Sequence, residues 1–136
     1  MRSILILLAA AATPALAAGP ATMTVPLTGA AEVPGPGDAT GTGSATLMPD
    51  TAKGQLCYTL SASGSDTPTM AHIHKGAVGV AGPVVVPLKA PASGPVKECT
   101  AVPGEVLAAI VANPADYYVN VHSAAFPKGA MRGQLK

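Results

Sequence analysis

The segment QLCYTLS, residues 55–61, decides the fold class, because apolar and polar side chains alternate along it. Leu56, Tyr58 and Leu60 share one face of an extended segment, whereas Cys57 lies on the other face. A period of two residues is typical of a β-strand with one buried face. The sequence therefore predicts a half-buried strand here, with Cys57 pointing away from the main core.

Short segments of similar character recur on both sides of this strand. We expect strands at residues 23–27, 41–48, 69–74, 84–88, 117–122 and 130–135. The 15 glycines and 14 prolines are spread along the chain, as expected of short strands joined by many turns. One helix is predicted at 104–112, where apolar residues recur at helical spacing. We therefore predict an all-β fold, a Greek-key-type antiparallel β-sandwich of seven or eight strands with one short crossover helix.

The first 17 residues have the form of a secretory signal peptide. Arg2 precedes a short apolar run, and Ala15-Leu16-Ala17 supplies the small residues of a cleavage site. Pro14 interrupts the run before it reaches the roughly 20 apolar residues of a membrane span, so a retained anchor is the less favoured alternative. We expect residues 18–136 to form one domain, exported to the periplasm or the extracellular space and not inserted in a membrane.

The charge of the chain excludes one class of partner. Its formal net charge of +1 falls to about zero when Arg2 is removed with the leader. A chain of this charge lacks the basic footprint of a nucleic-acid-binding protein. No acidic or basic run points to a polyionic protein partner, so the sequence identifies no protein partner.

Cys57 and Cys99 are the two cysteines of the chain. Export places them in an oxidising compartment, where an even number of cysteines usually forms disulfides. We expect one bridge that ties a surface connection onto the strand at 55–61. Thiolate ligation of a metal ion is the alternative, and the oxidising compartment makes it the less favoured one.

The three histidines of the chain lie in two of the predicted strands. In the segment MAHIH, residues 70–74, His72 and His74 leave the same face of a strand. Their Cα atoms would lie about 6.6 Å apart, a separation that two ligands of one metal ion can span. If the strand at 117–122 is a neighbour, His122 converges on the same point.

The same alternation assigns the other side chains of residues 117–122. It buries Tyr117, Val119 and Val121, and it turns Tyr118 and Asn120 outward together with the histidine. Imidazole binds copper, zinc, iron and nickel, and three nitrogens with an open position suit Cu(II) or a zinc hydroxide. We favour a copper ion, with zinc as a possible occupant. The alternative is that the histidines are ordinary hydrogen-bonded surface residues.

Other residues have less specific signals. Arg132 is either an anion contact or a structural hydrogen-bond fork, and the structural role is favoured. Met70 and Met131 are thioethers near the histidines in sequence, and either can act as a weak axial ligand of copper, although filling the core is the commoner role. The chain has no Gly-x-Ser-x-Gly elbow, no phosphate-cradling loop, no paired carboxylates and no calcium loop.

Five motifs together resemble one family. They are Ala31-Glu32-Val33-Pro34, residues 71–76, residues 82–88, residues 117–122 and Gly129-Ala130-Met131-Arg132-Gly133-Gln134-Leu135. In this order, from about Thr24 to Leu135, they are similar to the CHRD domain, first named from chordin. The resemblance implies an extracytoplasmic β-sandwich module. A more distant likeness is to the Greek-key sandwich of Cu,Zn superoxide dismutase, which also binds copper through a His-x-His strand and a later histidine.

Three functions are compatible with these features. The first is an exported protein that binds one copper ion through the three histidines, with Asn120, Tyr118 or Glu32 supporting the ligands. The second is a redox enzyme that acts on superoxide or a related oxidant at the same ion and uses Arg132 to attract an anion. The third is a binding or scaffold module without a metal, in which the histidines are incidental.

Overall fold

The computed structural model describes Thr13 and residues 21–136. Apart from Thr13, the predicted signal peptide lies outside the described residues, and it stays a prediction. The described strands are β1 (Met23–Thr28), β2 (Thr42–Asp50), β3 (Gln55–Ser63), β4 (Pro68–Lys75), β5 (Val84–Leu88), β6 (Val96–Ala101), β7 (Tyr117–Ser123) and β8 (Met131–Gln134). The helical elements are α1 (Gly104–Ala112) and two 3-10 turns, η1 (Gly29–Ala31) and η2 (Pro114–Asp116).

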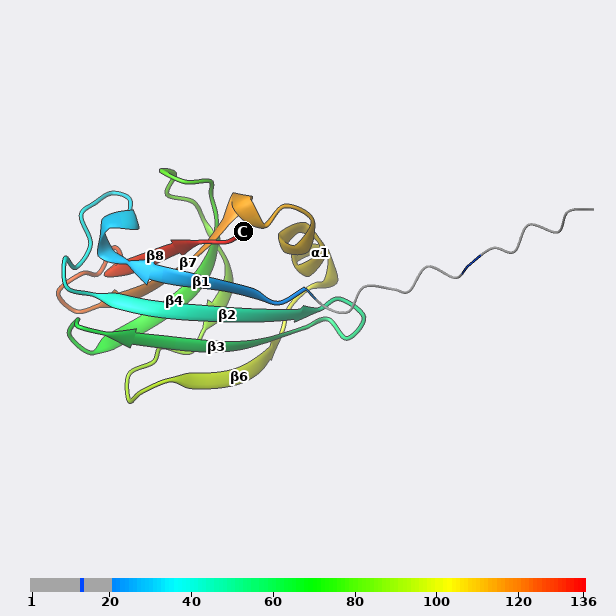
Figure 1. Cartoon of the computed structure of the whole chain (residues 1–136), viewed down its shortest axis with the longest axis horizontal. Helices are drawn as coiled ribbons and strands as arrows, with labels where there is room; N and C mark the ends of the chain where they lie inside the picture. The colour runs from blue at the N-terminus through cyan, green and yellow to red at the C-terminus, as the bar shows by residue number, and fades with distance from the viewer. Residues whose placement is uncertain (1–12, 14–20) are drawn as a thin grey trace, which may run out of the picture.

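The eight strands form one antiparallel sheet in the order β5-β4-β7-β8-β1-β2-β3-β6. The sheet is curled, so that β4 and β7 lie behind β1 and β2 in Figure 1. Strands β1 to β3 form a meander, whereas β6 returns beside β3 and β7 returns beside β4. Helix α1 connects β6 to β7 and lies at one end of the curled sheet (Figure 1). The predicted all-β class and short crossover helix are therefore confirmed.

The core lies inside the curl, where each strand contributes every second side chain. The alternation predicted for β3 is present, because Leu56, Tyr58 and Leu60 are 2% exposed or less. Strands and helix contribute further buried side chains, among them Val25, Leu27, Leu47, Ile73, Val86, Leu107, Ile110, Val119, Val121 and Leu135. With no tryptophan and one phenylalanine, aliphatic side chains fill most of this core.

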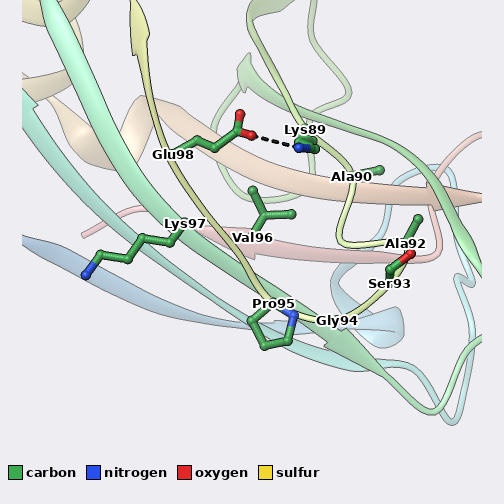
Figure 2. Close-up of a pocket in the computed structure, with 9 residues that line it drawn as sticks. All are labelled: Lys89, Ala90, Ala92, Ser93, Gly94, Pro95, Val96, Lys97 and Glu98. Atoms are coloured by element: carbon green, nitrogen blue, oxygen red, sulfur yellow. Dashed lines mark hydrogen bonds and ion pairs between the residues drawn. The ribbon is translucent and has the colours of Figure 1, made fainter.

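The curled sheet ends at β5 and β6, its two edge strands. Contacts cross the opening between these edges: the backbone N–H of Lys89, which follows β5, donates to the Tyr58 hydroxyl of β3 at 2.9 Å, and Lys89 Nζ lies 2.8 Å from Glu98 Oε1 on β6. A pocket lined by the β5–β6 connection and by β6 lies at this opening, and Figure 2 shows the Lys89–Glu98 ion pair beside it. Because both charged side chains are exposed, the pair adds little to stability.

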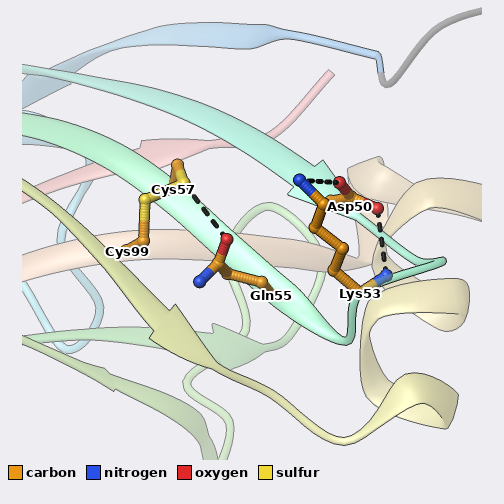
Figure 3. The surroundings of a disulfide bond; sticks show 5 residues. All are labelled: Asp50, Lys53, Gln55, Cys57 and Cys99. Carbon is orange, nitrogen blue, oxygen red and sulfur yellow. Dashed lines mark hydrogen bonds and ion pairs between the residues drawn. A yellow bond between two sulfur atoms is a disulfide. The ribbon is translucent and has the colours of Figure 1, made fainter.

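Strand β6 is the main difference from the sequence prediction, which placed Cys99 in a surface connection. Cys57 on β3 and Cys99 on β6 are directly opposite each other in the ladder and form the disulfide (Figure 3). The predicted pairing is therefore confirmed, and the predicted connection is wrong. The strand was missed because Lys97 and Glu98 interrupt its apolar pattern, which an exposed edge strand does not need.

Candidate metal centre

The histidines meet on the outer face of the β4–β7 pair. Ala71 and Ile73 point into the core at 1% exposure or less, so His72 and His74 occupy the opposite face of β4. Strand β7 is antiparallel to β4, with His72 opposite Asn120 and His74 opposite Tyr118. The two strands are neighbours, which is the condition under which the sequence brings the three histidines together, and His122 lies diagonally across from His72.

The three imidazoles are close enough to share one ion. His72 Nδ1 lies 3.2 Å from His122 Nε2, and one ligand nitrogen from each of the three histidines lies within 4.8 Å of the others. Two nitrogens bound to one ion at about 2.0–2.1 Å in tetrahedral geometry are roughly 3.4 Å apart. The His72–His122 pair already has about this separation.

Backbone carbonyls fix the tautomers of the two buried histidines. His74 Nδ1 lies 2.8 Å from Gly82 O, and His122 Nδ1 lies 3.0 Å from Pro127 O. A carbonyl oxygen only accepts hydrogen bonds, so each Nδ1 carries a proton, and in the neutral ring each Nε2 holds a lone pair. This is the arrangement of metal-binding histidines, whose second nitrogen donates to a fixed acceptor. His74 Nε2 is buried and has no hydrogen-bond partner among the described residues.

The electrostatics of the cluster keep imidazoles neutral. Burial lowers the pKa of His72, and the charges that His122 and His74 would carry lower it further. Burial also lowers the pKa of His122, against the Pro127 carbonyl, which raises it. Neutral His72 and His122 therefore offer lone pairs near pH 7 without competition from protons.

The three side chains that the sequence turns outward on β7 lie on the outer face of the strand, but that face is covered and not open to solvent. Tyr118 and Asn120 are 3% exposed and His122 is 7% exposed, so both faces of β7 are buried. Loops cover the second face: the Gly82 N–H donates to the Tyr118 hydroxyl at 3.1 Å, and Ala130 is fully buried beside β7. The candidate site is thus a recess under loops, with the half-buried His72 nearest to solvent.

Tyr118 separates His74 from Arg132. Its ring stacks on the His74 imidazole at 4.8 Å between centroids, with 6° between the planes. The Arg132 guanidinium carbon lies 3.4 Å from the centroid of the same ring. Because β4 and β8 flank β7, the phenol lies between an imidazole and a guanidinium. Tyr118 therefore supports His74 by stacking.

Arg132 is committed to the loop between β4 and β5. Its Nη1 donates to Val80 O at 2.8 Å and its Nη2 donates to Ala77 O at 2.9 Å, and the side chain is 2% exposed. The guanidinium thus makes the structural hydrogen bonds that the sequence analysis favoured over an anion contact. By holding the loop, Arg132 also positions Gly82, whose carbonyl oxygen accepts a hydrogen bond from His74 Nδ1.

Gln134 was missed by the sequence prediction. It lies two residues after Arg132 on the same face of β8, and its Oε1 accepts from Arg132 Nη2 at 3.0 Å. Its Nε2 lies within 2.9 Å of the carbonyl oxygens of Gly76, Ala115 and Tyr117. The alternation from Arg132 was the one signal that could have identified it.

Glu32 lies beside Asn120 and Arg132 and is not in direct contact with the histidines. It is 5% exposed, and Gly129, at φ 137°, leaves room for its carboxyl where a Cβ would collide. Burial raises the pKa of Glu32 to about 7, while the Arg132 charge and hydrogen bonds from Val33 and Asn120 act in the opposite direction. Glu32 Oε1 and Asn120 Oδ1 are both buried acceptors without a partner among the described residues, and a protonated carboxyl supplies a donor.

Replacing Glu32 by glutamine should remove a pH-dependent loss of stability. The carboxyl binds its proton more tightly in the folded chain than in the unfolded chain, so its contribution is lost as the pH rises through about 7. Allowing for screening by solvent, we expect the free energy of unfolding of the Glu32→Gln variant, relative to the native chain, to rise by about 2 kcal/mol between pH 5 and pH 8. Denaturant unfolding at both pH values measures this, and the subtraction cancels the contributions of the histidines. A difference that is the same at both pH values would contradict the assignment.

The two methionines predicted as possible copper ligands differ in their exposure to solvent. Met131 is fully buried and contacts the positions of Gly41 and Gly43, so it fills the core. Met70 is 48% exposed and lies opposite His122.

Comparisons with known proteins identify the family of this chain. The CHRD domain model matches residues 23–135, which is most of the chain. No curated protein and no solved structure gives a significant match, so the likeness to Cu,Zn superoxide dismutase stays a prediction from sequence. Within the described part of the chain, no helix has both the length and the hydropathy to cross a membrane. From Met23 to Leu135, the chain belongs to the CHRD domain family.

Proposed function

We propose that this chain is an exported protein that binds one metal ion, copper, through His72, His74 and His122. The observation that carries the proposal is the pair of carbonyl contacts, from Gly82 to His74 and from Pro127 to His122. These contacts leave the Nε2 of each ring available to a metal ion, with His122 Nε2 3.2 Å from His72 Nδ1 and one ligand nitrogen of each histidine within 4.8 Å of the others.

The donor set supports a transition metal. Three imidazoles suit copper and zinc, whereas calcium and magnesium prefer oxygen ligands, and no carboxylate belongs to the cluster. Copper is favoured because divalent copper binds nitrogen ligands more tightly than zinc does. Zinc is the second candidate for the same ligands.

Export is supported by the disulfide and by the form of the first 17 residues. A periplasmic or extracellular location would keep Cys57 and Cys99 oxidised.

Two observations disfavour the alternative functions. The redox enzyme relies on Arg132 as an anion contact, but that guanidinium is buried and already hydrogen-bonded to loop carbonyls. The metal-free module would leave His74 Nε2 buried without a partner.

Metal analysis and copper titration of the mature protein test the proposal. We expect one copper per chain, with an electron paramagnetic resonance spectrum of tetragonal Cu(II) bound by several nitrogens. Protein purified from its own exported compartment, without added metal salts, should contain a metal ion in comparable amount. Weak binding of several copper ions per chain, with no nitrogen hyperfine structure, would remove the proposal.

A further inference from the structure

Met70 is an exposed methionine beside the candidate metal centre. It is 48% exposed, whereas Met23 and Met131 are buried in the core. Exposing a thioether has no packing benefit, so filling the core does not account for this residue. Its position on the sheet, in contrast, relates it directly to the histidines.

The alternation of β4 places Met70, His72 and His74 on one face, at intervals of two residues. Met70 and His122 are direct partners in the β4–β7 ladder. Side chains in such a pair have Cβ atoms about 4.5–5.5 Å apart, which a flexible methionine side chain spans easily. Met70 is therefore a neighbour of the two histidines whose ligand nitrogens are already 3.2 Å apart.

The local backbone also changes at this point. The register of β4 against β7 shifts between Pro68 and Met70, as in a β-bulge. Bulges re-aim side chains and are frequent beside functional sites. The register shift therefore lies directly before Met70, the first of the candidate ligands along β4.

We propose that Met70 supplies a thioether ligand that completes the three-histidine site and makes it selective for Cu(I). Thioether sulfur is a soft donor that favours Cu(I), whereas Zn(II) gains little from it. This inference rests on the proposed copper-binding function and adds a selectivity for Cu(I) over Zn(II). It also gives the solvent side of the site, where His72 is only half-buried, a ligand that the histidines do not provide.

The test compares Met70→Leu with the native chain, because leucine keeps the volume and removes the sulfur. Competition with a chromogenic Cu(I) chelator under anaerobic conditions should show a loss of Cu(I) affinity of about 10-fold or more, with Zn(II) affinity changed less than about 2-fold. X-ray absorption at the copper edge should show a sulfur neighbour in the native protein and none in the variant. Met48→Leu, on β2 and away from β4 in the sheet, is the matched control and should leave both affinities unchanged.

The outcomes separate this inference from the proposed function. One copper per native chain, with equal Cu(I) affinity in Met70→Leu and no sulfur neighbour, would overturn the role of Met70 and leave the histidine site intact. A native chain that binds no copper would overturn both. Equal losses of Cu(I) and Zn(II) affinity would show that Met70 supports the recess without acting as a soft ligand, which would also overturn the inference.

Discussion

Replacing His122 by alanine should reduce copper affinity by more than about 100-fold. Substitutions of groups that only support a metal ligand already lower affinity by roughly 10- to 100-fold, and His122 is a proposed ligand itself. The variant leaves two imidazoles from one strand, which cannot surround an ion without the nitrogen from β7. Copper competition titrations with the native chain and the variant measure the difference.

His72→Ala separates loss of a ligand from damage to the fold. Among the described residues, the imidazole of His72 has one hydrogen-bond partner, His122, whereas His122 also donates to the Pro127 carbonyl. We therefore expect the metal-free His72→Ala chain to unfold at nearly the same denaturant concentration as the native chain while also losing copper. Lys128→Ala, on the exposed turn after Pro127, serves as a control that keeps both properties. Copper affinity that survives both histidine substitutions would contradict the proposed site.

Removing the disulfide should lower the free energy of unfolding by about 3 to 4 kcal/mol. Cys57 and Cys99 are separated by 42 residues, and the bond restricts that loop in the unfolded chain. It also fixes β6, which has only β3 as a neighbour in the sheet. Denaturant unfolding of the Cys57→Ser/Cys99→Ser variant measures the loss. In this variant, the rate of amide hydrogen exchange should increase more in β6 than in the other strands.

The adjacent cross-strand pair provides a matched control. Thr59 and Lys97 are partners in the same ladder, on the same face as the cysteines. The Thr59→Ala/Lys97→Ala variant removes one side-chain pair without opening a loop and should lose less than about 1 kcal/mol. Reduction of the native chain should reproduce the effect of the serine variant. A loss below about 1 kcal/mol in the serine variant would show that the disulfide is not a main source of stability.

The sequence predicted those parts of the fold that local patterns encode. Seven strands were anticipated within two residues at each end, and the helix at 104–112 has the predicted bounds. Each of these segments has an apolar face that must be buried, which leaves a period in the sequence. Strand β6 has no such face, because it lies at the edge with Lys97, Glu98 and Cys99 exposed. Its place is set by pairing with β3, a long-range contact without a local signal.

The site was predictable in its ligands and unpredictable in its surroundings. The shared face of His72 and His74, and the outward position of His122 on its own strand, follow from alternation, and the distances agree with them. The pairing of the two strands is a long-range contact that alternation does not predict. The cover over β7 depends on Arg132 reaching carbonyls more than 50 positions away in the chain. The tautomers depend on the carbonyls of Gly82 and Pro127, and every residue has a backbone carbonyl, so no residue type marks them. Metal binding itself stays a prediction.

The stacking of Tyr118 on His74 gives the chain an optical signal of its own. The chain has no tryptophan, so its ultraviolet emission comes from three tyrosines, and one of these rings is parallel to an imidazole of the candidate site. Cu(II) bound at such short range quenches the fluorescence of an aromatic ring, whereas Zn(II), with its filled d shell, does not. Tyrosine fluorescence can therefore distinguish the two ions in a cuvette without any label.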